Sequence, residues 1–232
     1  MHEELTFEEV TGGATVRLAG GGWAEYIQRL CAGFKAAGAR ERERGEGVRA
    51  LVGRLKRTRP STYRHCLRVA RHSNVLGRAL GLDESRLRQL SSTAMMHDIG
   101  KILVPDFILS RPRRPTRAER FVLRLHPTFG ALLASYYGLP AELRIRTEHH
   151  HERWDGRGYP HGLGGEDIPL MARVVQVTDS FDAMVERRAY NHPRTIDEAV
   201  AELRSESGKQ FDPRLVEAFL DTLPVDTLSH GR

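Results

Sequence analysis

Hydrophobic positions recur at helical spacing along most of the chain after about residue 48. Residues 62–80 show this period and are followed by Gly81, a residue type that commonly ends helices. Asp83 suits the N-cap of a second helix that runs to about Asp98, with Gly100 ending it. This region has no run in which hydrophobic and polar residues alternate as in a half-buried strand. The pattern therefore predicts an all-α helical bundle.

Later helices are marked by their expected first turns. Thr116 with Glu119, and Thr195 with Glu198, have the spacing of a capping box, in which each pair satisfies two free backbone N–H groups. Between these two helix starts, residues 153–167 are rich in glycine and predict one long loop.

Residues 1–48 follow a different pattern. Two short β-leaning pieces, residues 5–7 and 14–18, lie beside glycines and predict either a β-hairpin or an irregular arm. Large side chains at helical spacing favour a short amphipathic helix over residues 23–37: Tyr26, Leu30 and Phe34. Such a helix would pack on the bundle or form a homodimer.

A charged stretch, residues 40–47, predicts a linker or a solvated helix end. We therefore divide the chain into an N-terminal extension of unknown role, residues 1–48, and a main helical domain, residues 49–232.

Composition narrows the class of protein. The chain has 232 residues, 40% hydrophobic and 28% charged, which is typical of a globular protein. No apolar run reaches the roughly 18 residues that a membrane helix needs, and the acidic N-terminus is unlike a signal peptide. The two cysteines, Cys31 and Cys66, cannot build a disulfide framework. These features predict a cytoplasmic protein with reduced thiols and no membrane insertion.

The net charge of +6 comes mainly from arginine, since only four residues are lysine. Arginine favours phosphate or carboxylate partners, but genomic base composition is the preferred explanation for most of these residues. The arginines are scattered and no nucleic-acid recognition motif accompanies them, so we reject a nucleic-acid-binding protein.

Histidine and aspartate carry more information. Five predicted segments each deliver an imidazole or a carboxylate, mostly after a run of apolar residues: His65; His97 with Asp98; His126; the run 148–152; and Asp179 with Asp182. A bundle that packs the apolar stripes inward would bring these groups together. Because uncompensated buried carboxylates and imidazoles cost several kcal/mol each, the cluster needs a cation, and a divalent metal is the simplest one.

Each residue also has a simpler interpretation. His65 alone would be a hydrogen-bonded core histidine, and His72 on the same face is interpreted as structural. The run His149–His151 could be a solvated helix end. Taken together, the ordered set favours metal chemistry over these separate explanations.

Two motifs carry a resemblance to a known family. Residues 97–101, HDIGK, followed by Pro105-Asp106, resemble the signature of the HD phosphohydrolase superfamily. Residues 150–160, HHERWDGRGYP, resemble the defining segment of its HD-GYP branch. Shorter matches occur at residues 126–127, 168–170, 179–183 and 208–213, so that the resemblance covers about residues 55–219.

The resemblance implies an all-helical fold and a phosphodiesterase that hydrolyses cyclic di-GMP to pGpG and then GMP. It implies a cluster of two or three metal ions, often iron or manganese. The implied ligands are His65, His97, Asp98, His126, His150, His151 and Asp179. Asp98 would bridge two ions, and Lys101 would contact an oxygen of the scissile phosphate.

The remaining implied roles concern the surroundings of the metals. Arg188 would hold phosphate, with Tyr190 as a further substrate contact. Glu152 or Asp182 would orient ligand histidines. The loop residues Gly158, Tyr159 and Pro160 would support the site or present a surface to partner proteins.

The sequence departs from the family pattern at three positions. Members with three metals carry a glutamate where this chain has Ser61, so we expect two divalent ions, iron or manganese. Ala189 replaces a proline, and Asn191 replaces a basic residue, which removes one phosphate contact. A related substrate such as cyclic GMP-AMP is therefore an alternative.

Two metals about 4 Å apart would hold a bridging hydroxide and the phosphate oxygens, and thus supply both the nucleophile and charge neutralisation. The competing hypothesis is a catalytically weak module that binds a nucleotide or a partner protein in signalling. The complete set of two-metal ligands favours the enzyme.

Overall fold

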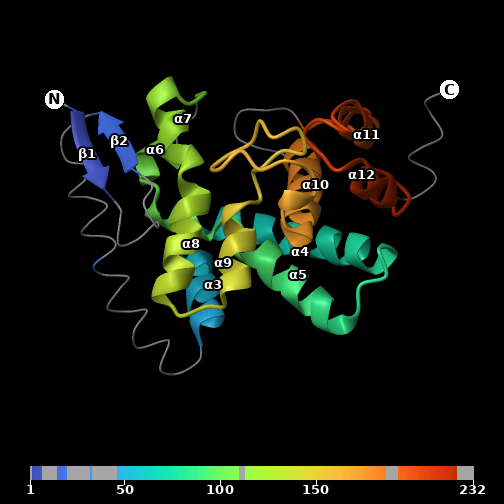
Figure 1. Ribbon diagram of the computed structural model, residues 1–232, viewed down its shortest axis with the longest axis horizontal. Coiled ribbons are helices and arrows are strands. Elements are labelled where there is room, and N and C mark those ends of the chain that lie inside the picture. Colours follow the sequence, from blue (N-terminus) through green and yellow to red (C-terminus); the bar gives the residue numbers. More distant parts are fainter. Residues whose placement is uncertain are drawn as a thin grey trace.

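The computed structural model describes residues 2–6, 15–19, 32, 46–109, 113–186 and 193–223. From residue 46 onward the described chain is helical, and the predicted all-α fold is confirmed (Figure 1). The helices in chain order are α3 (Gly47–Thr58), α4 (Pro60–Ala79), α5 (Glu84–Met96), the 3-10 helix η1 (Ile99–Leu103), α6 (Asp106–Leu109), α7 (Arg117–Arg124), α8 (His126–Tyr136), α9 (Ala141–Glu148), the 3-10 helix η2 (Gly165–Asp167), α10 (Leu170–Val185), α11 (Ile196–Ser205) and α12 (Pro213–Leu220).

Near the N-terminus the chain forms a two-stranded antiparallel sheet of β1 (His2–Thr6) and β2 (Thr15–Ala19). His2 is opposite Ala19 and Thr6 is opposite Thr15. Apart from residue 32, residues 20–45 lie outside the described part of the chain. The helix expected over residues 23–37 and most of the linker therefore stay predictions.

Helix α4 is the central element, because it packs against α3, α5, α10 and α12. Two hydrophobic clusters surround it. One combines α3, α5, η1 and α8 and includes Leu51, Leu55, Met96, Ile99 and Leu133. The other joins α4 to α10, α11 and α12 and includes Val69, Leu76, Val175, Leu203 and Phe219. Burial of these apolar side chains is the main force that fixes the helices relative to one another.

The predicted helix starts are confirmed. The Asp83 side chain accepts a hydrogen bond from the backbone N–H of Arg86 at 2.8 Å, and α5 begins at the next residue, Glu84. Both capping boxes, at residues 116–119 and 195–198, are present. The chain restarts as a new helix at residue 126, because Pro127 has no N–H to continue the bonding of α7.

Two glycines permit close approaches on which the site depends. A side-chain carbon at Gly100 would overlap the backbone carbonyl of His126, so only glycine allows η1 to pack directly on α8. A side-chain carbon at Gly158 would overlap the backbone of Glu152 in the same way. The first contact brings η1 against the start of α8, and the second holds the loop after α9 against the backbone of Glu152.

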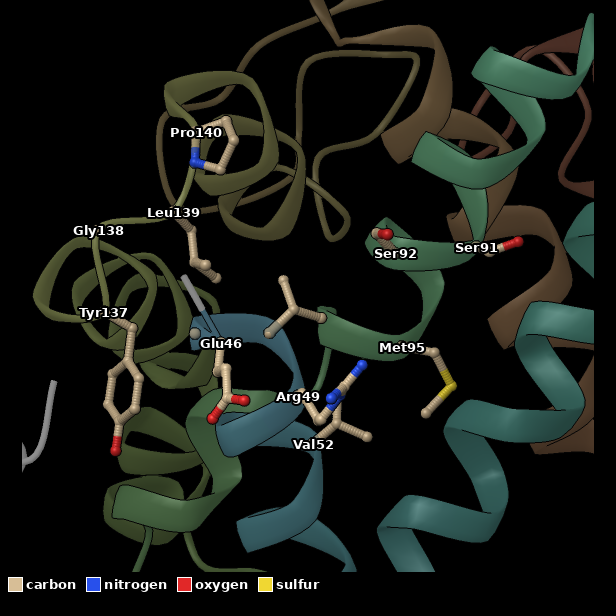
Figure 2. A pocket seen from close by; sticks show the side chains of 12 residues that line it. Glu46, Arg49, Val52, Ser91, Ser92, Met95, Tyr137, Gly138, Leu139 and Pro140 are labelled. Carbon is tan, nitrogen blue, oxygen red and sulfur yellow. The ribbon is translucent and has the colours of Figure 1, made fainter. Parts of the chain in front are cut away.

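A cavity of about 670 Å³ lies between α3, α5 and the turn that joins α8 to α9 (Figure 2). Its lining includes Arg49, Val52, Ser92, Met95 and Tyr137. None of the predicted site residues lines it, so this cavity is separate from the cluster described next. Among the described helices, none has the length and hydropathy needed to cross a lipid bilayer.

Candidate metal centre

The histidines and aspartates expected to bind metal lie together in the structure. They come from α4, from the junction of α5 and η1, from the start of α8, from the turn after α9, and from α10. Two sets of closely spaced donor atoms result, His65 with His97 and Asp98, and His126 with His150 and His151. We call the second set the imidazole group. The first set, together with Asp179, is called the carboxylate-rich group.

The carboxylate-rich group is held by contacts between imidazole nitrogens and carboxylate oxygens. The Nε2 atom of His65 lies 2.8 Å from Oδ1 of Asp179 and 3.8 Å from Oδ2 of Asp98. The Nε2 atom of His97 lies 3.6 Å from Oδ2 of Asp98 and 3.9 Å from Oδ1 of Asp179. This His97 nitrogen is buried and has no hydrogen-bond partner in the described structure.

The imidazole group contains three rings that pack at tilted or edge-to-face angles. The Nε2 atoms of His126 and His150 are 3.2 Å apart, and the rings of His150 and His151 are 4.2 Å apart between centroids. The rings of His126 and His151 meet edge to face at 5.0 Å. The donor nitrogens therefore converge on a small volume.

Asp98 lies between the two groups. Its Oδ1 atom is 3.3 Å from Nε2 of His126, whereas its Oδ2 atom faces His65 and His97. The ammonium group of Lys101 also lies 2.6 Å from Oδ2. One carboxylate thus faces both sets of donors, an arrangement that suits a ligand shared by two ions.

The orientation of the rings follows from hydrogen bonds on their other nitrogen. The Nδ1 atoms of His97, His126 and His150 each lie 2.7 Å from a backbone carbonyl oxygen, in the helical turn that precedes the histidine. A carbonyl oxygen only accepts, so Nδ1 carries the proton and Nε2 presents its lone pair to the centre. Helical backbone geometry therefore sets the tautomer of three rings.

The fourth ring is oriented by a carboxylate. The Nδ1 atom of His65 lies 2.6 Å from Oδ2 of Asp182. The guanidinium of Arg68 donates to both oxygens of Asp182, at 2.7 and 3.0 Å. Asp182 therefore contacts His65, one of the predicted ligands. Arg68 was missed from the sequence, although its position three residues after His65 on the same helical face was a usable signal.

Burial and neighbouring charges perturb the pKa values in opposite directions. Burial lowers the pKa of His65, but the carboxylates of Asp179, Asp182 and Asp98 outweigh it and raise the pKa to about 9. In the imidazole group burial dominates, and it lowers the pKa of His126 to about 3 and that of His151 to about 4.

The carboxyl groups respond to the cations beside them. Burial raises the pKa of Asp98, but the charges of Lys101 and the surrounding histidines hold the pKa well below its usual value. The pKa of Asp179 is lowered in the same manner, because the hydrogen bond and charge of His65 outweigh the effect of burial. Both carboxylates therefore stay ionised although they are largely withdrawn from water.

These residues fit a pair of divalent cations. The donor set combines imidazole nitrogens with ionised carboxylates, which suits iron, manganese or zinc. The Nε2 atom of His97 is buried and has no hydrogen-bond partner in the described structure, and a bound cation would satisfy its lone pair.

The other predicted residues differ in where the structure places them. The carboxylate of Glu152 accepts from the backbone N–H groups of His161 and Gly162, so it holds the loop, and within the described residues it forms no hydrogen bond to a predicted ligand histidine. The ring of Tyr159 stacks on His151 at 4.9 Å. Arg188 and Tyr190, with Ala189 and Asn191, lie outside the described residues. Pro160 is exposed, and a protein partner at this loop stays a prediction.

The simpler interpretations of two histidines are decided by the structure. His72 packs edge to face against Phe181 and Phe219, as expected for a structural residue. His149 and His150 are buried, so the solvated helix end considered for this run is wrong. Ser61 is exposed on α4, one turn before His65.

Comparison with models of known protein families identifies the family of this chain. The sequence model of the HD domain family matches residues 49–215. The chain belongs to the HD-domain family. The motifs quoted above correctly indicated this family, and the matched segment contains every predicted metal ligand.

Named relatives of this HD domain include phosphodiesterases of two kinds. A cyclic di-GMP phosphodiesterase of Thermotoga maritima is 42% identical over 164 residues, 68% of this chain and 44% of the relative. A 3'3'-cGAMP-specific phosphodiesterase of Vibrio cholerae is 34% identical over 178 residues, 76% of this chain and 34% of the relative. The chain thus spans about a third to a half of the length of these relatives.

A solved structure supports the fold. The HDG"Y"P protein of Bdellovibrio bacteriovorus superimposes with a TM-score of 0.58 at 16% identity, covering 88% of this chain and 73% of that chain. At this level of identity the likeness shows a shared helical fold.

Proposed function

We propose that this HD domain is a metal-dependent phosphodiesterase that hydrolyses cyclic di-GMP to pGpG, GMP or both. The observation that carries the proposal is Asp98, which lies between two groups of metal-ligating side chains and contacts Lys101. Phosphodiester hydrolysis needs a nucleophile at neutral pH and neutralisation of the phosphoryl charge, and two divalent ions bound by these groups would supply both.

The residues of the chain have distinct roles in this proposal. The ligands of the two ions are His65, His97, Asp98, His126, His150, His151 and Asp179. Lys101 is half-buried and ends 2.6 Å from Asp98, so its ammonium group stands where a substrate phosphate would approach the shared carboxylate. Its positive charge stabilises the negative charge that develops on the phosphoryl oxygens during attack.

The surroundings hold the ligands in one geometry. Asp182 accepts from His65 and is itself held by Arg68, so the His65 ring cannot rotate away from the centre. Arg188 and Tyr190 are proposed as substrate contacts on the basis of the family resemblance. The +6 net charge favours encounter with an anionic dinucleotide.

A second candidate substrate is cyclic GMP-AMP. The 34% identity to a cGAMP-specific phosphodiesterase of Vibrio cholerae and the presence of Asn191 favour it. The metal centre treats the phosphodiester alike in both dinucleotides, so discrimination must come from contacts to the bases.

The experiment is hydrolysis by protein reconstituted anaerobically with Fe(II) or Mn(II). Cyclic di-GMP and cyclic GMP-AMP are supplied separately, and pGpG, GMP and AMP are resolved by chromatography. We expect product from cyclic di-GMP with wild-type protein and none with Asp98→Ala. Cleavage of cyclic GMP-AMP alone would move the assignment to the second substrate. Tight nucleotide binding without any product would favour the signalling module instead.

A further inference from the structure

Three planar side chains from separate parts of the chain pack together beside the imidazole group. The guanidinium carbon of Arg124, the last residue of α7, lies 4.3 Å from the ring centroid of Tyr159. The ring of Tyr159 lies 4.9 Å from that of His151, with 24° between the two planes. Tyr159 therefore contacts a positively charged side chain and a proposed metal ligand at the same time.

The ring of His151 lacks the Nδ1 hydrogen bond that orients the neighbouring histidine rings. The rings of His97, His126 and His150 each hydrogen-bond a backbone carbonyl through Nδ1, whereas no described group hydrogen-bonds the ring of His151. The direction of this ring therefore depends on packing. Its stacking partner, Tyr159, is also joined to it through the backbone, since the N–H of Tyr159 donates to the carbonyl of His151 at 3.2 Å.

Arg124 is free to act on Tyr159. It is exposed, and within the described residues it forms no ion pair with a carboxylate. A guanidinium over the face of a tyrosine ring is attracted by the negative potential of that face. The helix that carries Arg124 is fixed at its start by the capping box of Thr116 and Glu119. Helix α7 therefore holds the guanidinium of Arg124 in place over the Tyr159 ring.

We propose that Arg124 is a positioning residue for the metal centre. By holding Tyr159 against His151, it fixes the direction of the one imidazole-group ligand that has no hydrogen bond on its ring. The proposal rests on the proposed function, because it takes His151 as a metal ligand. Arg124 itself touches neither the ions nor the reacting atoms, so its effect is on how well the ligand is held.

The test is a titration of the metal-free full chain with Mn(II). Arg124→Met removes the cation and keeps an extended side chain. We expect its Mn(II) affinity to fall about three- to tenfold, less than the roughly 10- to 100-fold typical when a hydrogen-bonded partner of a ligand is removed. Arg124→Lys keeps the positive charge and should restore most of the affinity.

The matched control is Arg117→Met, which removes an equal charge from an exposed position two turns earlier on α7. Its affinity should equal that of the wild type. Tyr159→Leu should weaken Mn(II) binding about as much as Arg124→Met. The double variant should bind Mn(II) with the same affinity as the more weakly binding of the two single variants, because both changes remove the same support.

Each result has a definite meaning. Wild-type affinity in Arg124→Met, or an equal loss in Arg117→Met, would overturn the positioning role while the metal centre stands. Absence of Mn(II) binding by the wild-type protein would overturn the metal centre, and the positioning role with it. Mn(II) binding by the wild-type protein therefore separates failure of the positioning role from failure of the metal centre.

Discussion

The carboxylate-rich group and the imidazole group differ in the charges that surround them. In the first, Asp98, Asp179 and Asp182 outweigh the effect of burial and raise the pKa of His65 to about 9. In the second, burial dominates and lowers the pKa of His126 to about 3 and of His151 to about 4. The contrast is carried by His65, whose two ring nitrogens contact Asp179 and Asp182, because burial lowers the pKa of His97 in the same group.

This difference explains why the groups need each other. The carboxylate-rich group contains two ionised carboxylates, Asp98 and Asp179, with Lys101 and His65 beside them. The imidazole group has neutral lone pairs but no carboxylate of its own. The Oδ1 atom of Asp98 faces His126 of the imidazole group, and its Oδ2 atom faces His97 of the carboxylate-rich group. A pair of ions around one shared carboxylate satisfies both sets.

Replacing the shared residue should have the largest effect. In Asp98→Ala both groups lose their common ligand, so we expect fewer than one ion per chain. Activity should fall by more than about 100-fold, beyond the usual cost of losing a residue that merely supports a ligand. Elemental analysis and the hydrolysis assay measure the two effects. Asp197→Asn, in the first turn of α11, is the control, and two ions retained in Asp98→Ala would refute the shared ligand.

Changes in one group only should remove one ion. His97→Ala removes a donor from the carboxylate-rich group, and His150→Ala removes one from the imidazole group. Each variant should retain about one ion per chain and lose at least about tenfold in activity, since both ions act on the same phosphate. Loss of both ions in either variant would show that the two groups are not separable.

The support behind His65 should matter less. Asp182→Asn weakens the hydrogen bond to Nδ1 of His65 and the pairing with Arg68, so we expect a loss of about 10- to 100-fold in affinity for one of the two ions. Arg68→Met leaves the carboxylate in place and should cost less. An Arg68→Met effect larger than that of Asp182→Asn would contradict this order. Mn(II) titration of each metal-free protein separates the cases.

The smallest expected effect is the change in stability of the metal-free protein with pH. The pKa values of His126 and His151 lie below the value of about 6.5 expected in the unfolded chain. As the pH falls, the unfolded chain binds protons first, so this part of the stability is present above pH 6.5 and is lost as the pH falls through about 4 for His151 and about 3 for His126. His65 acts oppositely, since its contribution is present below pH 6.5 and is lost as the pH rises through about 9.

We therefore expect the melting temperature of chelator-treated protein to be highest near neutral pH and to fall by a few degrees or more by pH 4, as about 1 kcal/mol corresponds to a few degrees for a domain of this size. A melting temperature that rises steadily toward pH 4 would show that the rings of His126 and His151 are not buried in the neutral form.

Much of this arrangement was predictable from local sequence. The capping boxes and the Asp83 cap depend on residues three apart, so their start points could be read directly. The convergence of the ligands followed from apolar stripes that end in histidine or aspartate. The resemblance then assigned roles that spacing alone leaves open, such as the sharing of Asp98.

Other features depend on contacts between distant segments. The need for Gly100 appears only when η1 meets the carbonyl of His126. Glu152 looked like a support for histidines, but it binds the loop backbone, because the turn at Gly158 brings that loop over it. The stack of Arg124 on Tyr159 joins residues 35 positions apart in the chain, and no local pattern marks it.

The most direct test of the central claim is the number of metal ions per chain in protein purified without oxygen. Iron, manganese and zinc are counted by elemental analysis against protein concentration. Two ions per chain, reduced to fewer than one in Asp98→Ala, is the result expected from two donor groups around one carboxylate. An ion-free wild-type protein that stays empty after incubation with Fe(II) and Mn(II) would contradict it.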